Sequence, residues 1–143
     1  MEQKKTILVV DDEPHLTYML AHRLRSESVN VLEQNNGQDG YKTAINLIPD
    51  LVITDYQMPR MSGIAMCQAL KADARTAHVP VLMITGRGHR VTRDDLECTN
   101  VRELMSKPFS FNELLSKVFE LIQVHPEDAS GQTSEDAEKK TRM

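Results

Sequence analysis

Short apolar runs alternate with amphipathic stretches along most of this chain, and this alternation constrains the fold more than any other sequence feature. Five runs stand out, at residues 7–10, 29–33, 51–54, 81–85 and 104–106. Strand-length runs that alternate with helical patterns are typical of repeated strand–helix units around a parallel sheet. We therefore predict an α/β fold with a five-stranded parallel sheet.

The composition of the runs distinguishes central strands from edge strands. Runs 7–10, 51–54 and 81–85 are dominated by Val, Ile, Leu and Met and lack polar alternation. Such runs are expected where helices cover both faces of a strand. Run 29–33 is half polar, so we expect it to form an edge strand.

Apolar residues recur at helical spacing between the runs. The expected helices follow Pro14, Gly40 and Ser62 and cover about 91–97 and 111–122. Pro14 suits a first helical turn, Ser62 suits an N-cap, and Ser110 with Glu113 fits a capping box. The pattern at 91–97 is the weakest of the five.

The length and the N-terminal sequence predict one cytoplasmic domain. A chain of 143 residues is long enough for a single domain and too short to promise a second. Its longest apolar runs are far below the ~20 residues that a bilayer requires. Residues 1–5 are polar and lead directly into an apolar run, without the features of a signal peptide.

Charge, cysteines and C-terminal composition exclude several classes of protein and indicate where the domain ends. The formal net charge is −4, from 17 Lys and Arg against 21 Asp and Glu, which speaks against direct nucleic-acid binding. Cys67 and Cys98 lack a C-x-x-C partner, which argues against a disulfide framework and a zinc site. Residues 125–143 are almost entirely polar, so we predict a domain at 1–124 followed by a disordered tail or truncated linker.

Polar residues follow four of the five runs. Asp11 and Asp12 follow the first, Asp55 the third and Lys107 the fifth, while Thr85 ends the fourth. Ligands of parallel α/β sheets bind outside the carboxyl ends of the strands. Three carboxylates, a hydroxyl and an ammonium are therefore expected on one rim of the sheet.

The charge of this rim predicts a bound cation. Asp11, Asp12 and Asp55 contribute −3 and Lys107 contributes +1, which leaves −2. Mg²⁺ would bring the sum to zero, and oxygen ligands are those that it prefers. If Asp55 became an acyl phosphate, the added oxygens would need the metal, Lys107 and the Thr85 hydroxyl as partners.

Each of these residues also has an ordinary structural explanation. Asp11 and Asp12 precede Pro14 and could cap a helix. Asp55 could be a turn residue, Thr85 could simply end a strand, and Lys107 could be a solvated lysine. Their convergence on one rim is what favours a site.

In order and spacing, these motifs together resemble the receiver domains of two-component response regulators. The matching residues are Asp11-Asp12, Asp55, Met58-Pro59, Gly63, Thr85 and Lys107-Pro108-Phe109. The resemblance covers residues 6 to about 124. It implies a flavodoxin-like three-layer sandwich with strand order 2-1-3-4-5.

The resemblance also implies a role for each site residue. Asp55 would accept a phosphoryl group, Lys107 would pair with it, and Thr85 would donate a hydrogen bond to it. Asp12, Asp55 and the Gln57 carbonyl would ligate Mg²⁺ directly, and Asp11 would act through a bound water. The Lys107–Pro108 peptide would be cis.

The same resemblance implies a phosphorylation-controlled switch rather than an enzyme, with at most slow self-dephosphorylation. The phosphoryl donor would be a histidine kinase or a histidine phosphotransfer protein. The output would be a contact with another protein, near the fifth strand and the last helix, made by a monomer or weak dimer.

Two departures from the family pattern leave alternatives open. Leu104 stands where the family commonly has an aromatic residue, which favours a receiver-like interaction module with no phosphate-dependent switch. Asn100 stands where the family often has glycine, and Asn tolerates a left-handed conformation. A slow phosphohydrolase would need a second carboxylate near Asp55, but position 57 is Gln57.

Overall fold

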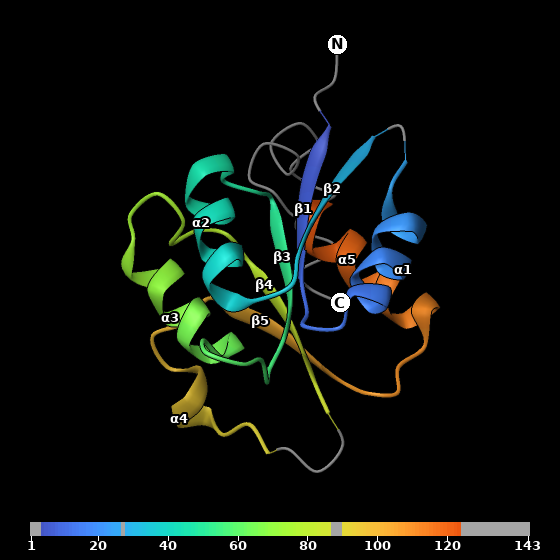
Figure 1. The fold of residues 1–143 in the computed structure, drawn as a ribbon. Coiled ribbons are helices and arrows are strands. Elements are labelled where there is room, and N and C mark those ends of the chain that lie inside the picture. The colour runs from blue at the N-terminus through green and yellow to red at the C-terminus, as the bar shows by residue number, and fades with distance from the viewer. Residues whose placement is uncertain (1–3, 27, 87–89, 124–143) are drawn as a thin grey trace, which may run out of the picture.

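All five apolar runs form strands in the computed structural model, which describes residues 4–26, 28–86 and 90–123 (Figure 1). The strands are β1 (Lys5–Val10), β2 (Val29–Gln34), β3 (Leu51–Asp55), β4 (Val81–Thr85) and β5 (Val101–Ser106). The helices are α1 (Pro14–Leu24), α2 (Gly37–Leu47), α3 (Gly63–Ala72), α4 (Arg93–Leu96) and α5 (Phe111–Gln123). The strands form one parallel sheet in the order β2-β1-β3-β4-β5, which confirms the predicted topology.

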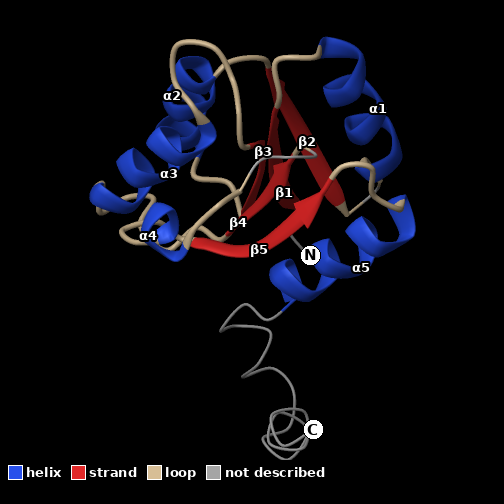
Figure 2. Cartoon of the chain, turned by 90° about the horizontal axis from the view of Figure 1, so that it is seen from below, coloured by secondary structure: helices blue, strands red, loops and turns tan. Residues whose placement is uncertain are grey.

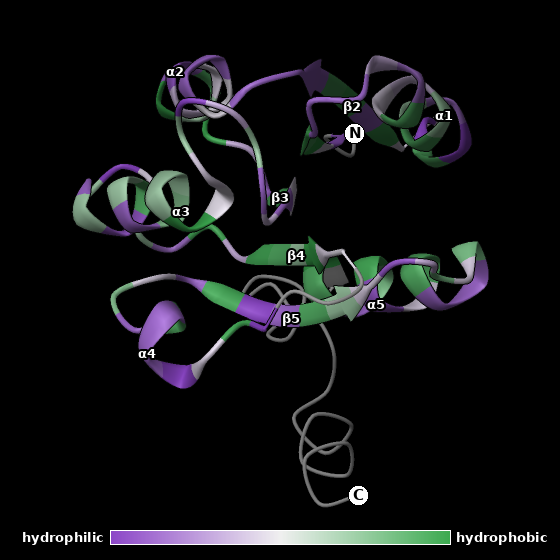
Figure 3. Ribbon diagram, turned by 60° about the horizontal axis from the view of Figure 1, so that its bottom comes forward, coloured by the Kyte–Doolittle hydropathy of each residue, from purple (hydrophilic) through white to green (hydrophobic). Residues whose placement is uncertain are grey.

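The sheet is the middle layer of three. Helices α1 and α5 lie on one face, whereas α2, α3 and the short α4 lie on the other (Figures 1 and 2). As predicted, β2 is an edge strand, and β5 forms the opposite edge. In Figure 3, β4 is hydrophobic along its length, as expected for a strand with neighbours on both sides, whereas α4 is mostly hydrophilic.

Side chains of β1 alternate between two hydrophobic cores. Ile7 and Val9 belong to the core under α1 and α5, while Leu8 and Val10 belong to the core under α2 and α3. This alternation follows from the two-residue period of a strand. Because both faces of β1 are covered, its apolar run is continuous, as the sequence predicted.

The strand register brings the carboxyl ends of the strands to one edge of the sheet. Val10 pairs with both Gln34 and Thr54, and Asp55 pairs with Ile84. Thr85 pairs with Ser106 at the end of the last two strands. The residues that follow these positions therefore meet at a common rim.

Helix starts agree with the predicted capping residues. Pro14 begins α1, and the Ser62 side chain accepts a hydrogen bond from the Ala65 N–H at 3.1 Å. Ser110 likewise accepts from the Glu113 N–H at 3.3 Å.

Helix α2 begins earlier than predicted, at Gly37, because Asn36 caps it by accepting from the Asp39 N–H. A Cβ atom added to Gly37 would lie 2.5 Å from the Met61 carbonyl oxygen, so only glycine fits at this position.

Three boundaries differ from the sequence prediction. Helix α4 spans only Arg93–Leu96, within the predicted 91–97, and a Thr92–Asp95 capping box starts it. Strand β5 begins at Val101 rather than at residue 104. Asp55 is the last residue of β3 and does not lie beyond it.

The predicted left-handed conformation of Asn100 is wrong. The left-handed residue of this turn is Cys98, with φ 62°. Asn100 is instead buried, and its amide donates hydrogen bonds to the Val79 and Thr76 carbonyls. It therefore serves as a side-chain bridge to the loop between α3 and β4, a role that glycine could not fill.

Two predictions concern the ends of the chain and the membrane. The disordered tail predicted at 125–143 lies outside the described residues. Within the described ranges, every helix is too short or too polar to cross a bilayer.

Candidate metal centre

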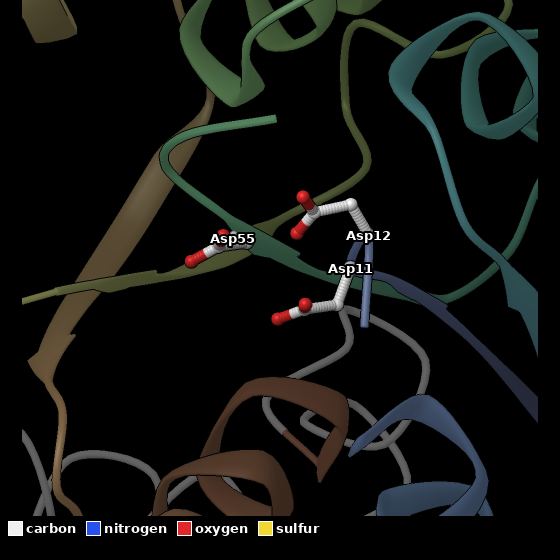
Figure 4. A group of neighbouring side chains, drawn as sticks. All are labelled: Asp11, Asp12 and Asp55. Atoms are coloured by element: carbon white, nitrogen blue, oxygen red, sulfur yellow. The ribbon is translucent and has the colours of Figure 1, made fainter. Parts of the chain in front are cut away.

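Three carboxylates gather at the carboxyl edge of the sheet. Asp11 and Asp12 follow β1, and Asp55 ends β3. Each contributes an oxygen to a set whose members lie within 4.8 Å of one another (Figure 4). Asp11 and Asp55 are buried, whereas Asp12 is exposed. The structure thus brings together the acidic residues that the sequence assigned to a metal site.

Lys107 lies beside two of these carboxylates. Its Nζ is 3.3 Å from Asp55 Oδ1 and 3.6 Å from Asp11 Oδ2. Its backbone N–H donates to the Thr85 carbonyl at 2.7 Å, which ties the end of β5 to β4. The Lys107–Pro108 peptide is cis, as the family resemblance implied.

The pKa values of Asp11, Asp55 and Lys107 are all raised in the folded protein. Burial raises the pKa of Asp11 to about 6, and repulsion from Asp55 adds to this shift. Burial also raises the pKa of Asp55, against the attraction of Lys107. For Lys107, burial lowers the pKa, but attraction to Asp11 and Asp55 outweighs it, so the pKa is raised. Burial therefore disfavours the ionised forms of Asp11 and Asp55, and the attraction of Lys107 offsets only part of this effect.

The backbone holds Asp11 firmly. Its Oδ1 accepts a hydrogen bond from the Glu13 N–H at 3.0 Å, and its own N–H donates to the Gln34 carbonyl at 3.1 Å. With the Lys107 ion pair on Oδ2, both carboxylate oxygens of Asp11 have partners. Asp12 differs, because its side chain forms no hydrogen bond or ion pair with the residues that the structure describes.

The loop after Asp55 folds back on the strand. The Tyr56 N–H donates to the Ile84 carbonyl at 2.8 Å, and the Gly63 N–H donates to the Tyr56 carbonyl at 2.9 Å. A Cβ atom at Gly63 would lie 2.2 Å from the Asp55 carbonyl oxygen. The first residue of α3 must therefore be glycine for the loop to close this tightly.

Gln57 and Thr85 are less closely tied to the acidic cluster. Gln57 is exposed on the loop after β3, and its predicted role as a carbonyl ligand stays a prediction. Thr85 is buried at the end of β4, and its hydroxyl donates to the Met105 carbonyl at 3.4 Å rather than to a carboxylate. It lies on the expected edge but points toward β5.

Sequence reasoning missed Asn35 at the same rim. This residue follows β2, and its amide donates a hydrogen bond to the Asp11 carbonyl at 2.8 Å. Its place after the second apolar run predicts that it lies on the rim, but no sequence pattern shows which groups its amide binds.

Leu104 lies away from the acidic cluster, on β5. It pairs with Met83 of β4, and 39% of its surface is exposed. Together with Leu96 of α4 and Val101 it lines a shallow open groove. The residue that replaces the common aromatic is therefore not packed into the core.

The donor set fits a hard divalent cation. Magnesium prefers oxygen ligands and keeps several waters, so it is bound by a few carboxylates rather than by a full protein cage. Three close carboxylates with one exposed member, Asp12, meet both requirements. A cation bound there would be attracted by the carboxylates of Asp11 and Asp55.

A parallel sheet in this order defines a flavodoxin-like domain, and its carboxyl edge carries an acidic cluster and a lysine. Residues 7–119 match the sequence model of the response regulator receiver domain. The chain belongs to this family and is a receiver domain of two-component systems. Receiver domains bind Mg²⁺ at an acidic site, act as phosphoacceptor switches and interact with histidine kinases.

Individual relatives agree with this assignment. The chain is 32% identical to the DNA-binding dual master transcriptional regulator RpaA of Synechocystis sp. over 117 residues, which cover 82% of the chain and 48% of RpaA. It thus spans about half the length of this relative. The receiver domain of a signal transduction histidine kinase from Syntrophus aciditrophicus superposes with a TM-score of 0.72 at 29% identity, covering 83% of this chain and 90% of that one.

A third comparison shows the same fold. The receiver domain of sensor histidine kinase PA1611 from Pseudomonas aeruginosa has a TM-score of 0.73 at 22% identity, with 83% of this chain and 98% of that chain covered. That structure holds a magnesium ion coordinated in its active-site cleft.

Proposed function

We propose that Asp55 accepts a phosphoryl group from a phosphohistidine of a histidine kinase or histidine phosphotransfer protein. The observation that carries this proposal is the position of the Asp55 carboxylate, which lies within 4.8 Å of two other acids and 3.3 Å from Lys107 Nζ. Asp55 is also the member of the acidic set that ends a central strand, at the carboxyl edge of the sheet.

The transfer is a balanced displacement at phosphorus. A carboxylate oxygen of Asp55 forms the new O–P bond while the P–N bond of the donor phosphohistidine breaks. The electron pair of the P–N bond remains on the imidazole nitrogen. Because the transition state of phosphoryl transfer demands little covalent chemistry, positioning and charge stabilisation supply most of the catalysis.

Lys107 provides charge stabilisation from the protein itself. Its Nζ is already beside Asp55 Oδ1, so an ammonium stands where phosphoryl oxygens would gather after transfer. Attraction to Asp11 and Asp55 raises the pKa of Lys107 against the opposing effect of burial, which keeps it charged. Charge-assisted hydrogen bonds of this kind are roughly twice as strong as neutral ones.

Asp12, Asp55 and the Gln57 carbonyl would hold Mg²⁺ directly, with Asp11 acting through a bound water. When bound, the cation would neutralise charge on the phosphoryl oxygens. Support comes from the acidic cluster and from the magnesium ion in the PA1611 receiver domain. Thr85 would exchange its bond to the Met105 carbonyl for one to a phosphoryl oxygen.

The output of the domain would be an altered contact with a downstream protein. The loop that carries Lys107 connects β5 to α5, and the surface near these two elements is where we expect this contact. Leu104 supports the alternative of an interaction module without a phosphate-dependent switch, because no ring couples it to Thr85.

The proposal is tested by incubation with acetyl phosphate and Mg²⁺, followed by intact-mass measurement. Wild type is expected to gain one phosphoryl group, and Asp55→Asn is expected to gain none. Asp39→Asn, on the exposed face of α2, is the matched control and should label like wild type. An unlabelled wild type, or a labelled Asp55→Asn, would contradict the proposal.

A second measurement separates the switch from the inert module. Backbone amide spectra are recorded with Mg²⁺ alone and with Mg²⁺ plus beryllofluoride, a phosphoryl analogue. A switch shows beryllofluoride-dependent shifts that extend from Asp55 to β5. An inert module shows none beyond those of the metal.

A further inference from the structure

We propose that Asn35 is a positioning residue of the magnesium site and that it sets the direction in which Asp12 points. The inference rests on the proposed function, since it concerns the same site. Asn35 belongs to the loop between β2 and α2, which contributes no acidic residue to the cluster.

The Asn35 amide binds two groups on the neighbouring loop and helix. Its Nδ2 lies 2.8 Å from the Asp11 carbonyl oxygen and 3.1 Å from Thr17 Oγ1. A carbonyl can only accept, and the Thr17 hydroxyl already donates to the Pro14 carbonyl at 2.9 Å. Both partners therefore require a donor, which fixes the amide nitrogen on this side.

The last residue of β2 binds the other backbone group of Asp11. The Gln34 carbonyl accepts a hydrogen bond from the Asp11 N–H at 3.1 Å. Hydrogen bonds from two consecutive residues thus bracket Asp11, one on its N–H and one on its carbonyl. Residues 34 and 35 therefore hold the start of the β1–α1 loop in place, although neither is a predicted metal ligand.

The hydrogen bonds to the backbone of Asp11 have their main consequence at Asp12. The Asp11 carbonyl and the Asp12 N–H belong to one rigid peptide plane. Asp12 is exposed, and among the described residues its carboxylate has no partner that would hold it toward Asp11 and Asp55. The direction of the Asp12 side chain therefore depends on the backbone at Asp12. The Asn35 amide holds the peptide plane between Asp11 and Asp12, which orients that backbone.

The expected effect is a loss of preorganisation rather than of a ligand. Removing a partner that orients a metal ligand typically costs 10–100-fold in metal affinity. Asn35 is itself exposed and acts through a peptide plane, so we expect an effect at or below the lower limit of this range, a roughly threefold to tenfold weaker affinity.

The test compares Asn35→Ala with Asn36→Ala in the full chain, by amide NMR titration with MgCl₂ alone. Asn36 is a matched control, because it caps α2 and binds Asp39 but forms no hydrogen bond with Asp11 in the part of the chain that the structure describes. We expect a weaker magnesium affinity for Asn35→Ala only. Chemical denaturation of both variants shows whether either loses stability.

A second readout is independent of the metal. In the metal-free protein, Asn35→Ala should shift the Asp12 amide resonance, whereas Asn36→Ala should not. Equal magnesium affinity in wild type and Asn35→Ala, or an unmoved Asp12 amide, overturns this inference and leaves the proposed function intact. Absence of magnesium binding by wild type overturns both.

Discussion

Lys107 Nζ lies 3.3 Å from Asp55 Oδ1, although the two residues come from strands that are not neighbours in the sheet. Strand β4 separates β3 from β5, so the lysine side chain reaches across its carboxyl end. A contact of this length depends on the register of two strand pairs at once. The charge balance of the site is therefore a property of the whole sheet edge.

Replacing Lys107 by Met should slow phosphorylation of Asp55 by about 10²-fold, the scale seen when one oxyanion donor is removed. The reason is the loss of the ammonium at Asp55. The rate is measured from the time course of phosphoryl incorporation with acetyl phosphate. Lys117→Met, which removes an ion pair with Glu103 on the far part of β5, is the control and should react at the wild-type rate.

Without Mg²⁺, Asp11 should make the protein less stable as the pH rises from about 4 to about 6. Its pKa is raised to about 6 in the folded protein because of burial. Between these pH values the folded state binds more protons than the unfolded state, so the free energy of unfolding falls with rising pH.

Asp11→Asn should remove this pH-dependent loss and be more stable than wild type at pH 7. Urea denaturation across the pH range gives the difference between the two proteins. Asp73→Asn is a control of opposite sign, since Arg75 lowers the pKa of Asp73 to about 2. A wild-type protein that loses stability relative to Asp11→Asn as the pH falls from about 6 to about 4 would contradict the prediction.

Magnesium should stabilise wild type but not Asp12→Ala. A ligand that binds only the folded state raises the free energy of unfolding by about 2.7 kcal/mol at a hundredfold excess over its dissociation constant. Because the Asp12 side chain is exposed and has no partner among the described residues, its removal should cost little stability in metal-free protein. Thermal denaturation with and without MgCl₂ tests both statements, and a metal-dependent shift that persists in Asp12→Ala refutes the assigned ligand.

Gly63→Ala should destabilise the protein by about 1–3 kcal/mol, the usual cost of overpacking. The added Cβ would lie 2.2 Å from the Asp55 carbonyl oxygen, a backbone atom that cannot move independently of the site. Helix propensity alone predicts the opposite sign, because Ala is the better helix former. Denaturation curves decide between the steric cost and the gain in helix propensity. A more stable Gly63→Ala protein would show that the loop after β3 can move to accommodate the added Cβ.

Most of the fold follows from sequence patterns whose physical basis is simple. Continuous apolar runs identified β1, β3 and β4 because central parallel strands are buried on both faces. The start of β5 was missed because Arg102 and Glu103 are charged residues of an edge strand, where one side is free of a neighbour. The extent of α4 was overestimated because a four-residue helix has too few positions to show a period.

The site was predictable where chemistry and strand ends coincide. Asp11, Asp12, Asp55 and Lys107 were all identified from their places after apolar runs, and the structure brings them together. The role of Asn35 was not, because a neutral amide acting on a backbone carbonyl leaves no charge pattern in the sequence. Asn100 was misjudged for a similar reason, since only tertiary structure shows which carbonyls its amide meets.

The acids and the ammonium of this site have unequal structural support. Asp11, Asp12 and Asp55 are attached to β1 and β3 in the middle of the sheet, while Lys107 follows the edge strand β5. Edge elements fray at lower free energy than central ones. Fraying of β5 would withdraw the built-in counter-charge and leave the acidic half assembled, so a partly opened molecule would attract cations more strongly than the closed one.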